Sequence, residues 1–120
     1  MIKFKVQIIG SGNAARKHEQ AFKLLPELYE VVKKGPVDIY DICNVPGAHY
    51  ECVRSALRQN KHVIVEKPIC GSLYEVDLLH NAELRSEGNV CPISQYRWAG
   101  HDPTPYRILS RWKRKLSYWD

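Results

Sequence analysis

The order of apolar and polar positions predicts strands that alternate with helices. Apolar residues alternate with polar ones, or form short β-branched runs, in four segments, which we interpret as strands at residues 4–9, 37–43, 62–65 and 90–94. Apolar residues recur at helical spacing in three others, at residues 14–25, 48–59 and 72–88. Residues 29–32 fit either a short strand or a last helical turn. Strands alternating with helices predict an α/β fold built on a parallel sheet.

The first strand runs directly into the turn Gly10-Ser11-Gly12, and a helix follows. This context is the one that a dinucleotide-binding turn requires. Gly10 would permit the tight turn, and Gly12 would let the backbone approach a pyrophosphate. Ala15 stands in place of a third glycine and is small enough for close packing of helix on strand. The alternative is a turn that only connects the strand to the helix.

A second informative segment is His-Val-Ile-Val-Glu-Lys-Pro at residues 62–68. Its β-branched run predicts a buried strand that ends in Glu66, Lys67 and Pro68. Ionisable groups at the carboxyl end of a buried parallel strand lie where open α/β sheets bind ligands. The alternative is a solvated Glu-Lys pair in a loop. The glycine turn near the N-terminus is what favours the ligand site.

Composition and charge narrow the class of protein. The 120 residues contain 44% hydrophobic and 26% charged residues, as in ordinary globular proteins, which leads us to expect one small domain. No apolar run approaches the roughly 18 residues that cross a bilayer. The N-terminal segment lacks a signal-peptide pattern, so we expect a cytoplasmic protein without a membrane partner. Residues 97–120 carry six Lys/Arg and two Asp/Glu, which accounts for most of the net charge of +5.

The tail and the cysteines could each carry a further function. The basic tail contains tryptophans and could contact an anionic surface, but a solvated chain end is the commoner case, so we expect no nucleic-acid partner. The cysteines form no Cys-x-x-Cys pair and have no histidine at metal spacing. We therefore expect no metal site and four reduced thiols, with Cys43 and Cys52 acting as small hydrophobic residues.

Four motifs together resemble the glucose–fructose oxidoreductase / inositol dehydrogenase / rhizopine-catabolism (Gfo/Idh/MocA) family. They lie at residues 10–18, 37–49, 62–68 and 95–98, so the resemblance covers about residues 3–98. Members of this family carry an N-terminal nicotinamide-dinucleotide domain and a C-terminal sheet domain. The resemblance implies a Rossmann-like domain at residues 1–96, with NAD or NADP as the cofactor, followed by a basic, Trp-rich tail at residues 97–120.

Carried over position by position, the resemblance implies cofactor-binding residues of three kinds. Gly10, Gly12, Asn13, Ala14 and Ala15 would hold the pyrophosphate. Glu66 and Lys67 would contact the nicotinamide ribose, and Arg97 would lie near the nicotinamide end. Asn44 would lie beside the cofactor, and His49 matches the family's histidine at the start of the following helix. Lys67 is also the implied catalytic residue, because a lysine there could orient a substrate hydroxyl or help its proton leave. For His18 and His49, a capping or helix-surface role remains an equal alternative to cofactor contact. Asn44 stands where the family usually has Thr or Ser.

The chain also departs from the family. An acidic residue should close the second strand about 20 residues beyond the glycines to hold the adenosine ribose, but that position is Gly35. Relative to the family, the second strand is cut short, and the next helix and strand are missing. The family's C-terminal domain, which supplies much of the substrate pocket and usually the catalytic His and Asp, has no counterpart. The expected fold is therefore a truncated Rossmann-like parallel sheet in three α/β/α layers.

The deletion raises a problem of topology. In the strand order 3-2-1-4-5-6, residues 37–43 match the fourth strand, which lies across strand one from the second. Residues 33–36 could reach about 14 Å, whereas a return across strand one to the other end of the sheet needs about 17–20 Å. We therefore expect either that residues 37–43 move to the second strand's side of strand one or that the domain folds poorly.

Two hypotheses about function follow. The first is a nucleotide-binding NAD(P) module of an oxidoreductase that acts on a sugar- or polyol-like CH–OH group, inactive alone and dependent on a protein partner that supplies a substrate domain. The second is a non-catalytic remnant or interaction protein with a basic aromatic tail. The glycine turn and the Glu-Lys-Pro segment favour the first; the missing acid and domain favour the second.

Overall fold

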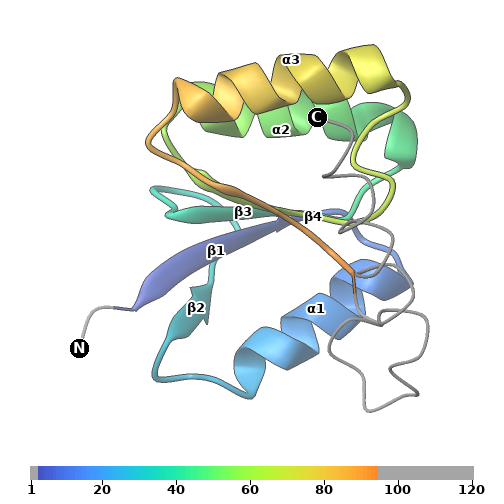
Figure 1. Ribbon diagram of the computed structural model, residues 1–120. Coiled ribbons are helices and arrows are strands. Elements are labelled where there is room, and N and C mark those ends of the chain that lie inside the picture. The colour runs from blue at the N-terminus through green and yellow to red at the C-terminus, as the bar shows by residue number, and fades with distance from the viewer. Residues whose placement is uncertain (1–2, 95–120) are drawn as a thin grey trace, which may run out of the picture.

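A computed structural model describes residues 3–94, which form a five-stranded parallel sheet between two layers of helices (Figure 1). The strands are β1 (Phe4–Ile9), β2 (Tyr29–Val31), β3 (Ile39–Ile42), β4 (His62–Val65) and β5 (Val90–Pro92). The helices are α1 (Asn13–Lys23), the short 3₁₀ turn η1 (Pro46–Ala48), α2 (His49–Arg58) and α3 (Leu73–Leu84). Helix α1 covers one face of the sheet, and α2 and α3 cover the other. The three-layer parallel α/β/α fold predicted from the sequence is confirmed.

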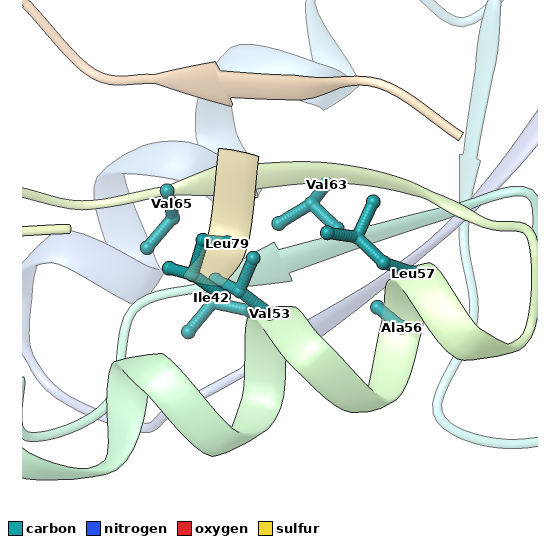
Figure 2. Packing of buried hydrophobic residues seen from close by; sticks show 7 residues of the cluster. All are labelled: Ile42, Val53, Ala56, Leu57, Val63, Val65 and Leu79. Carbon is teal, nitrogen blue, oxygen red and sulfur yellow. The ribbon is translucent and has the colours of Figure 1, made fainter. Parts of the chain in front are cut away.

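The main hydrophobic core lies between the sheet and the pair α2–α3. Figure 2 shows its buried members, which are Ile42, Val53, Ala56, Leu57, Val63, Val65 and Leu79. Alternate residues of β3 and β4 point to this face, as the period-two pattern of a strand requires. The opposite face is smaller: Val6, Ala15 and Val37 are its fully buried apolar residues within the described region.

The strand order is β2-β1-β3-β4-β5, so β2 and β3 flank β1 on opposite sides. Our expectation that residues 37–43 would move to the second strand's side of β1 is wrong. The order instead corresponds to the family order with the third strand missing.

Strand register explains why so short a connection suffices. Strand β2 pairs only with the first half of β1, where Val31 lies level with Val6. Strand β3 begins at that same level, because Ile39 also pairs with Val6. The chain therefore shifts sideways by two strand spacings, about 10 Å, without returning along the strands. Eight residue steps can span about 26 Å, so the crossing is unstrained in length.

Element ends follow local chemistry. Ser72 caps α3, since its Oγ accepts a hydrogen bond from the Glu75 amide at 3.2 Å, as the predicted capping box requires. Residues 29–32, left open between helix and strand, contribute the strand β2. Strand β5 and helix α3 end earlier than the sequence pattern predicts. The motif at residues 95–98, including Arg97, and the tail at 97–120 lie outside the described residues. Among the helices of residues 3–94, none is long and apolar enough to cross a membrane.

Gly10 joins β1 to the turn in a conformation that other residues rarely adopt. Its φ is +136°, and a Cβ atom built on it would lie 2.7 Å from the carbonyl oxygen of Cys43. Gly12 differs, because its φ is −85° and a Cβ there would meet no described atom within 4 Å. Gly10 is therefore required by the packing of β1 against the end of β3, whereas Gly12 faces open space.

We expect Gly10→Ala to destabilise the domain, and Gly12→Ala to have a smaller effect. The Gly10 variant combines a backbone clash with a strained φ, which costs about 1–3 kcal/mol from strain alone. At the N-cap position of Gly12 the cost is about 1 kcal/mol or less. Urea denaturation followed by circular dichroism measures both free energies of unfolding. Equal stability of the two variants would contradict this account of Gly10.

Candidate functional site

The carboxyl ends of β1, β3 and β4 bring the sequence-predicted residues to one edge of the sheet. The glycine turn follows β1, Asn44 lies two residues after the end of β3, and Glu66 and Lys67 follow β4. Segments that are more than 50 residues apart in sequence therefore meet where open α/β sheets bind ligands.

The glycine turn presents a free helix N-terminus. Gly12 is the N-cap of α1, and no described side chain caps this end; its first turn carries no acidic residue. The free amide groups and the positive end of the helix dipole therefore favour an anion. Asn13 keeps its side chain at this end, where its Oδ1 accepts a hydrogen bond from Arg16 at 2.6 Å. The open space at Gly12 is the space that a pyrophosphate against the backbone requires.

His18, on α1, bridges two carboxylates from different strands. Its Nδ1 lies 2.7 Å from Asp41 Oδ2, and its Nε2 lies 2.8 Å from Glu66 Oε1. Asp41, on β3, is fully buried, and the side chains of His18 and Glu66 are 17% and 20% exposed. An imidazolium can donate to both carboxylates at once, so these contacts link α1 to β3 and to the end of β4.

The charge of His18 follows from these contacts. The hydrogen bond to Asp41, supported by one with Cys43, outweighs the effect of burial and raises the pKa of His18 from 6.5 to about 11. His18 is therefore an imidazolium at neutral pH. It offsets the charge of Asp41, which would otherwise be buried without a counter-charge.

Cys43 completes this cluster and is not the small hydrophobic residue that its strand pattern predicts. Its Sγ lies 3.2 Å from His18 Nδ1, and its thiol donates to Asp41 Oδ1 at 3.4 Å. Burial raises the pKa of the thiol. His18, Asp41 and Cys43 offer donor atoms within 4.8 Å of one another, a grouping of metal-ligand types that the search of sequence spacings missed. Hydrogen bonds among the three already account for their approach. Cys52, in contrast, packs against the core as predicted.

His49 holds two loops of the site together. It is 1% exposed, with Nδ1 2.7 Å from the carbonyl oxygen of Pro68 and Nε2 2.9 Å from that of Asn44. It therefore lies neither on a helix surface nor toward open space. Its contacts assign it a positioning role, because they join the turn after β3 to the loop after β4.

Asn44 is the residue of this edge with unused hydrogen-bonding capacity. Its Nδ2 donates to Cys52 Sγ at 3.4 Å, whereas its buried Oδ1 has no partner within the described part of the chain. An unpartnered buried acceptor costs about 1–3 kcal/mol, so a ligand that donates a hydrogen bond here would be favoured.

Glu66 and Lys67 follow β4 directly but differ in exposure. Lys67 is exposed, whereas Glu66 is half-buried and bonded to His18. Glu66, His18, Ala14, Lys17 and Ile93 line a groove of about 450 Å³. The wall of this groove combines the first turns of α1 with the ends of β4 and β5.

Most of the site residues predicted from the sequence lie at one edge of the sheet. Residues of the glycine turn, Asn44, Glu66 and Lys67 share one edge, His49 lies beneath it, and Arg97 is outside the described residues. Sequence reasoning missed Asp41, which looks like the polar partner in an alternating strand. The available signal was that strands of a parallel sheet covered by helices on both sides are buried on both faces, so an acidic residue within one needs a partner.

A family model describing an oxidoreductase family with an NAD-binding Rossmann fold matches residues 22–93, more than half of the chain. The chain therefore belongs to a class of NAD-binding oxidoreductase domains. The family is Gfo/Idh/MocA, as the sequence motifs indicate. Comparison with curated proteins finds no match.

Solved structures with a similar fold include three bacterial proteins. The WlbA dehydrogenase of Bordetella pertussis, in complex with NADH and UDP-GlcNAcA, matches with a TM-score of 0.77 and 15% identity over 82% of this chain and 39% of its own. An oxidoreductase of Sinorhizobium meliloti matches with a TM-score of 0.68 and 16% identity, over 77% of this chain and 37% of its own. An NAD-binding protein of Listeria innocua matches with a TM-score of 0.69 and 18% identity, over 81% of this chain and 37% of its own. This chain therefore spans well under half the length of these proteins.

We expect the stability of the domain to fall as pH rises from about 6.5 toward 11. The folded-state pKa of His18 lies above its unfolded value, so its contribution is complete below about pH 6.5 and is lost as pH approaches 11. Urea denaturation at intervals across this range measures the effect. A domain whose free energy of unfolding stays constant over this range would contradict the ion pair.

The double variant His18→Leu/Asp41→Leu provides the matched control. His18→Leu alone leaves a buried carboxylate unpaired, which typically costs about 3–5 kcal/mol. Removing both charges should recover much of that loss and flatten the pH dependence. A double variant that is less stable than His18→Leu alone would show that the pair does not act as a unit.

Proposed function

We propose that this chain binds a nicotinamide dinucleotide, NAD(H) or NADP(H), as the cofactor module of an oxidoreductase. The observation that carries the proposal is the glycine turn at an uncapped helix N-terminus, with open space at Gly12. Backbone amides and the helix dipole there attract a pyrophosphate. The family match and the NAD-binding relatives support the same ligand.

In this proposal each residue of the edge has a part. The pyrophosphate lies against the turn and first helical positions, which are Gly10, Gly12, Asn13, Ala14 and Ala15. Asn44 accepts a hydrogen bond from the nicotinamide end through its free Oδ1. Glu66 and Lys67 flank the nicotinamide ribose, with Glu66 oriented by His18. Arg97 contacts the nicotinamide end in this proposal. His49 holds the turn after β3 and the loop after β4 in place through its contacts with Asn44 and Pro68.

The reaction we propose is hydride transfer at a sugar- or polyol-like CH–OH group. The dinucleotide supplies the hydride chemistry when bound. Lys67 is exposed beside the site, where its ammonium can orient a substrate hydroxyl or assist the movement of its proton. The similar fold of a dehydrogenase bound to NADH and UDP-GlcNAcA supports a sugar-like substrate.

We further propose that these residues alone do not complete the reaction. The chain spans 39% of the length of the WlbA dehydrogenase and 37% of the two other structures named above. Within residues 3–94, Lys67 is the one residue of this edge for which the family resemblance implies a catalytic role, and the groove beside Glu66 is lined by Ala14, Lys17, His18, Glu66 and Ile93. A protein partner that supplies the substrate pocket would complete the site.

Ligand-dependent thermal stabilisation tests cofactor binding. NAD(H) or NADP(H) at 100 times its dissociation constant should add about 2.7 kcal/mol, which raises the melting temperature by several degrees. Gly12→Val should abolish this shift, because its side chain fills the space for the pyrophosphate. Lys67→Ala should weaken binding less, since Lys67 contacts one end of the cofactor.

Two results would overturn this proposal. If none of the four dinucleotides stabilises the protein at millimolar concentration, cofactor binding is wrong and the interaction-protein hypothesis remains. If Gly12→Val binds as the wild type does, the glycine turn has only a structural role. The melting temperature of each variant without ligand separates loss of binding from loss of folding.

A further inference from the structure

The adenosine end of the proposed site has an unusual charge. A hollow of about 370 Å³ lies between the start of α1 and the end of β2. In Rossmann domains the adenosine ribose is recognised beyond the second strand, where an acidic residue holds the 2′-hydroxyl of NAD or a nearby arginine accommodates the 2′-phosphate of NADP. The residues of this hollow therefore bear on the choice between the two cofactors.

Two basic residues line the hollow from opposite sides. Arg16 comes from the first turns of α1, and Lys33 comes from the loop after β2. Asn13 Oδ1 accepts a hydrogen bond from the Arg16 guanidinium at 2.6 Å, which keeps Arg16 close to the turn. Neither Arg16 nor Lys33 forms an ion pair with any residue of the described range 3–94. Both side chains are exposed and remain free to contact a ligand.

The acidic residues nearby do not replace the missing ribose ligand. Val32, Lys33 and Lys34 follow β2 directly, where the acid is expected. Glu30 alternates with Val31, which lines the hollow, so Glu30 points to the other face of the sheet. The Asp38 carboxylate accepts a hydrogen bond from the Lys5 amide at 2.8 Å.

Glu19 is the remaining acid at the hollow. Its Oε1 lies 3.4 Å from Lys23 Nζ, one turn further along α1 and away from the glycine turn. This pair reduces the negative charge that Glu19 contributes. Arg16 and Lys33 therefore leave the hollow with a net positive charge.

We infer that the site prefers NADP(H) to NAD(H), with Arg16 and Lys33 contacting the 2′-phosphate. This inference rests on the proposed function. A phosphate monoester carries a charge of about −1.5 to −2 at pH 7, so it gains from two cations that a ribose hydroxyl does not need. The planar guanidinium of Arg16 suits a phosphate with two parallel hydrogen bonds, and Lys33 adds a point charge.

Calorimetric titration of the purified chain with NADP⁺ and NAD⁺ tests the inference. We expect NADP⁺ to bind at least about tenfold more tightly, with a preference that weakens as salt increases. Titration with 2′,5′-ADP and with 5′-ADP isolates the phosphate, and the first should bind more tightly. Equal or tighter binding of NAD⁺ would overturn the inference and leave the proposed function intact. Binding of neither dinucleotide would overturn both.

Variants at two adjacent lysines sharpen the test. Lys33→Ala should weaken NADP⁺ binding severalfold and leave NAD⁺ binding unchanged, whereas Lys34→Ala, whose side chain does not line the hollow, should change neither. Lys33→Asp places an acid after β2 and should reverse the preference toward NAD⁺. Glu19→Gln should leave NAD⁺ binding unchanged; if it weakens NAD⁺ binding instead, Glu19 is the ribose ligand and the inference is wrong. These side chains are exposed, and melting curves without ligand confirm folding.

Discussion

The bridge made by His18 is the interaction on which the smaller half of this domain depends. The α1 face of the sheet has few buried apolar residues, because a single helix covers it. A positive imidazolium between Asp41 and Glu66 supplies there what apolar packing supplies on the α2–α3 face. It fixes α1 relative to β3 and β4, and so relates the glycine turn to the end of the Glu-Lys-Pro segment. The same contacts make the stability of this face depend on charge, because removing any one of the three residues leaves a partner without its counter-charge.

The second constraint is the register of β2. Because β2 pairs only with the first half of β1, its end lies level with the start of β3. A parallel sheet can therefore lose a strand and a helix between these points and still close with a seven-residue loop. A return of about 17–20 Å is needed only where the second strand extends along the whole of the first. With a strand of three residues that distance is no longer required, and β3 keeps its place on the far side of β1.

The sequence predicts what depends on neighbours along the chain. Periodicity places the strands and helices, glycines place the turn after β1, and Ser72 with Glu75 places the start of α3. It predicts the shared edge because carboxyl ends of parallel strands must meet there. It does not predict that His18 meets Asp41, a contact across 23 residues that depends on how α1 rotates over β3. The position of β2 also escapes prediction, since register is decided by pairing that short segments specify weakly.

The short β2 also bears on the adenosine end of the proposed cofactor site. The loop that replaces the missing strand and helix begins directly after β2, so its first residues lie where a longer second strand would present its acid. A short crossing loop at the surface favours polar and turn-forming residues, and here these are two lysines, a glycine and a proline. The shortening therefore does more than remove an acid, because it places the Lys33 side chain in the hollow beside the start of α1. Under the inferred preference for NADP(H), cofactor choice follows from the same local change that sets the topology.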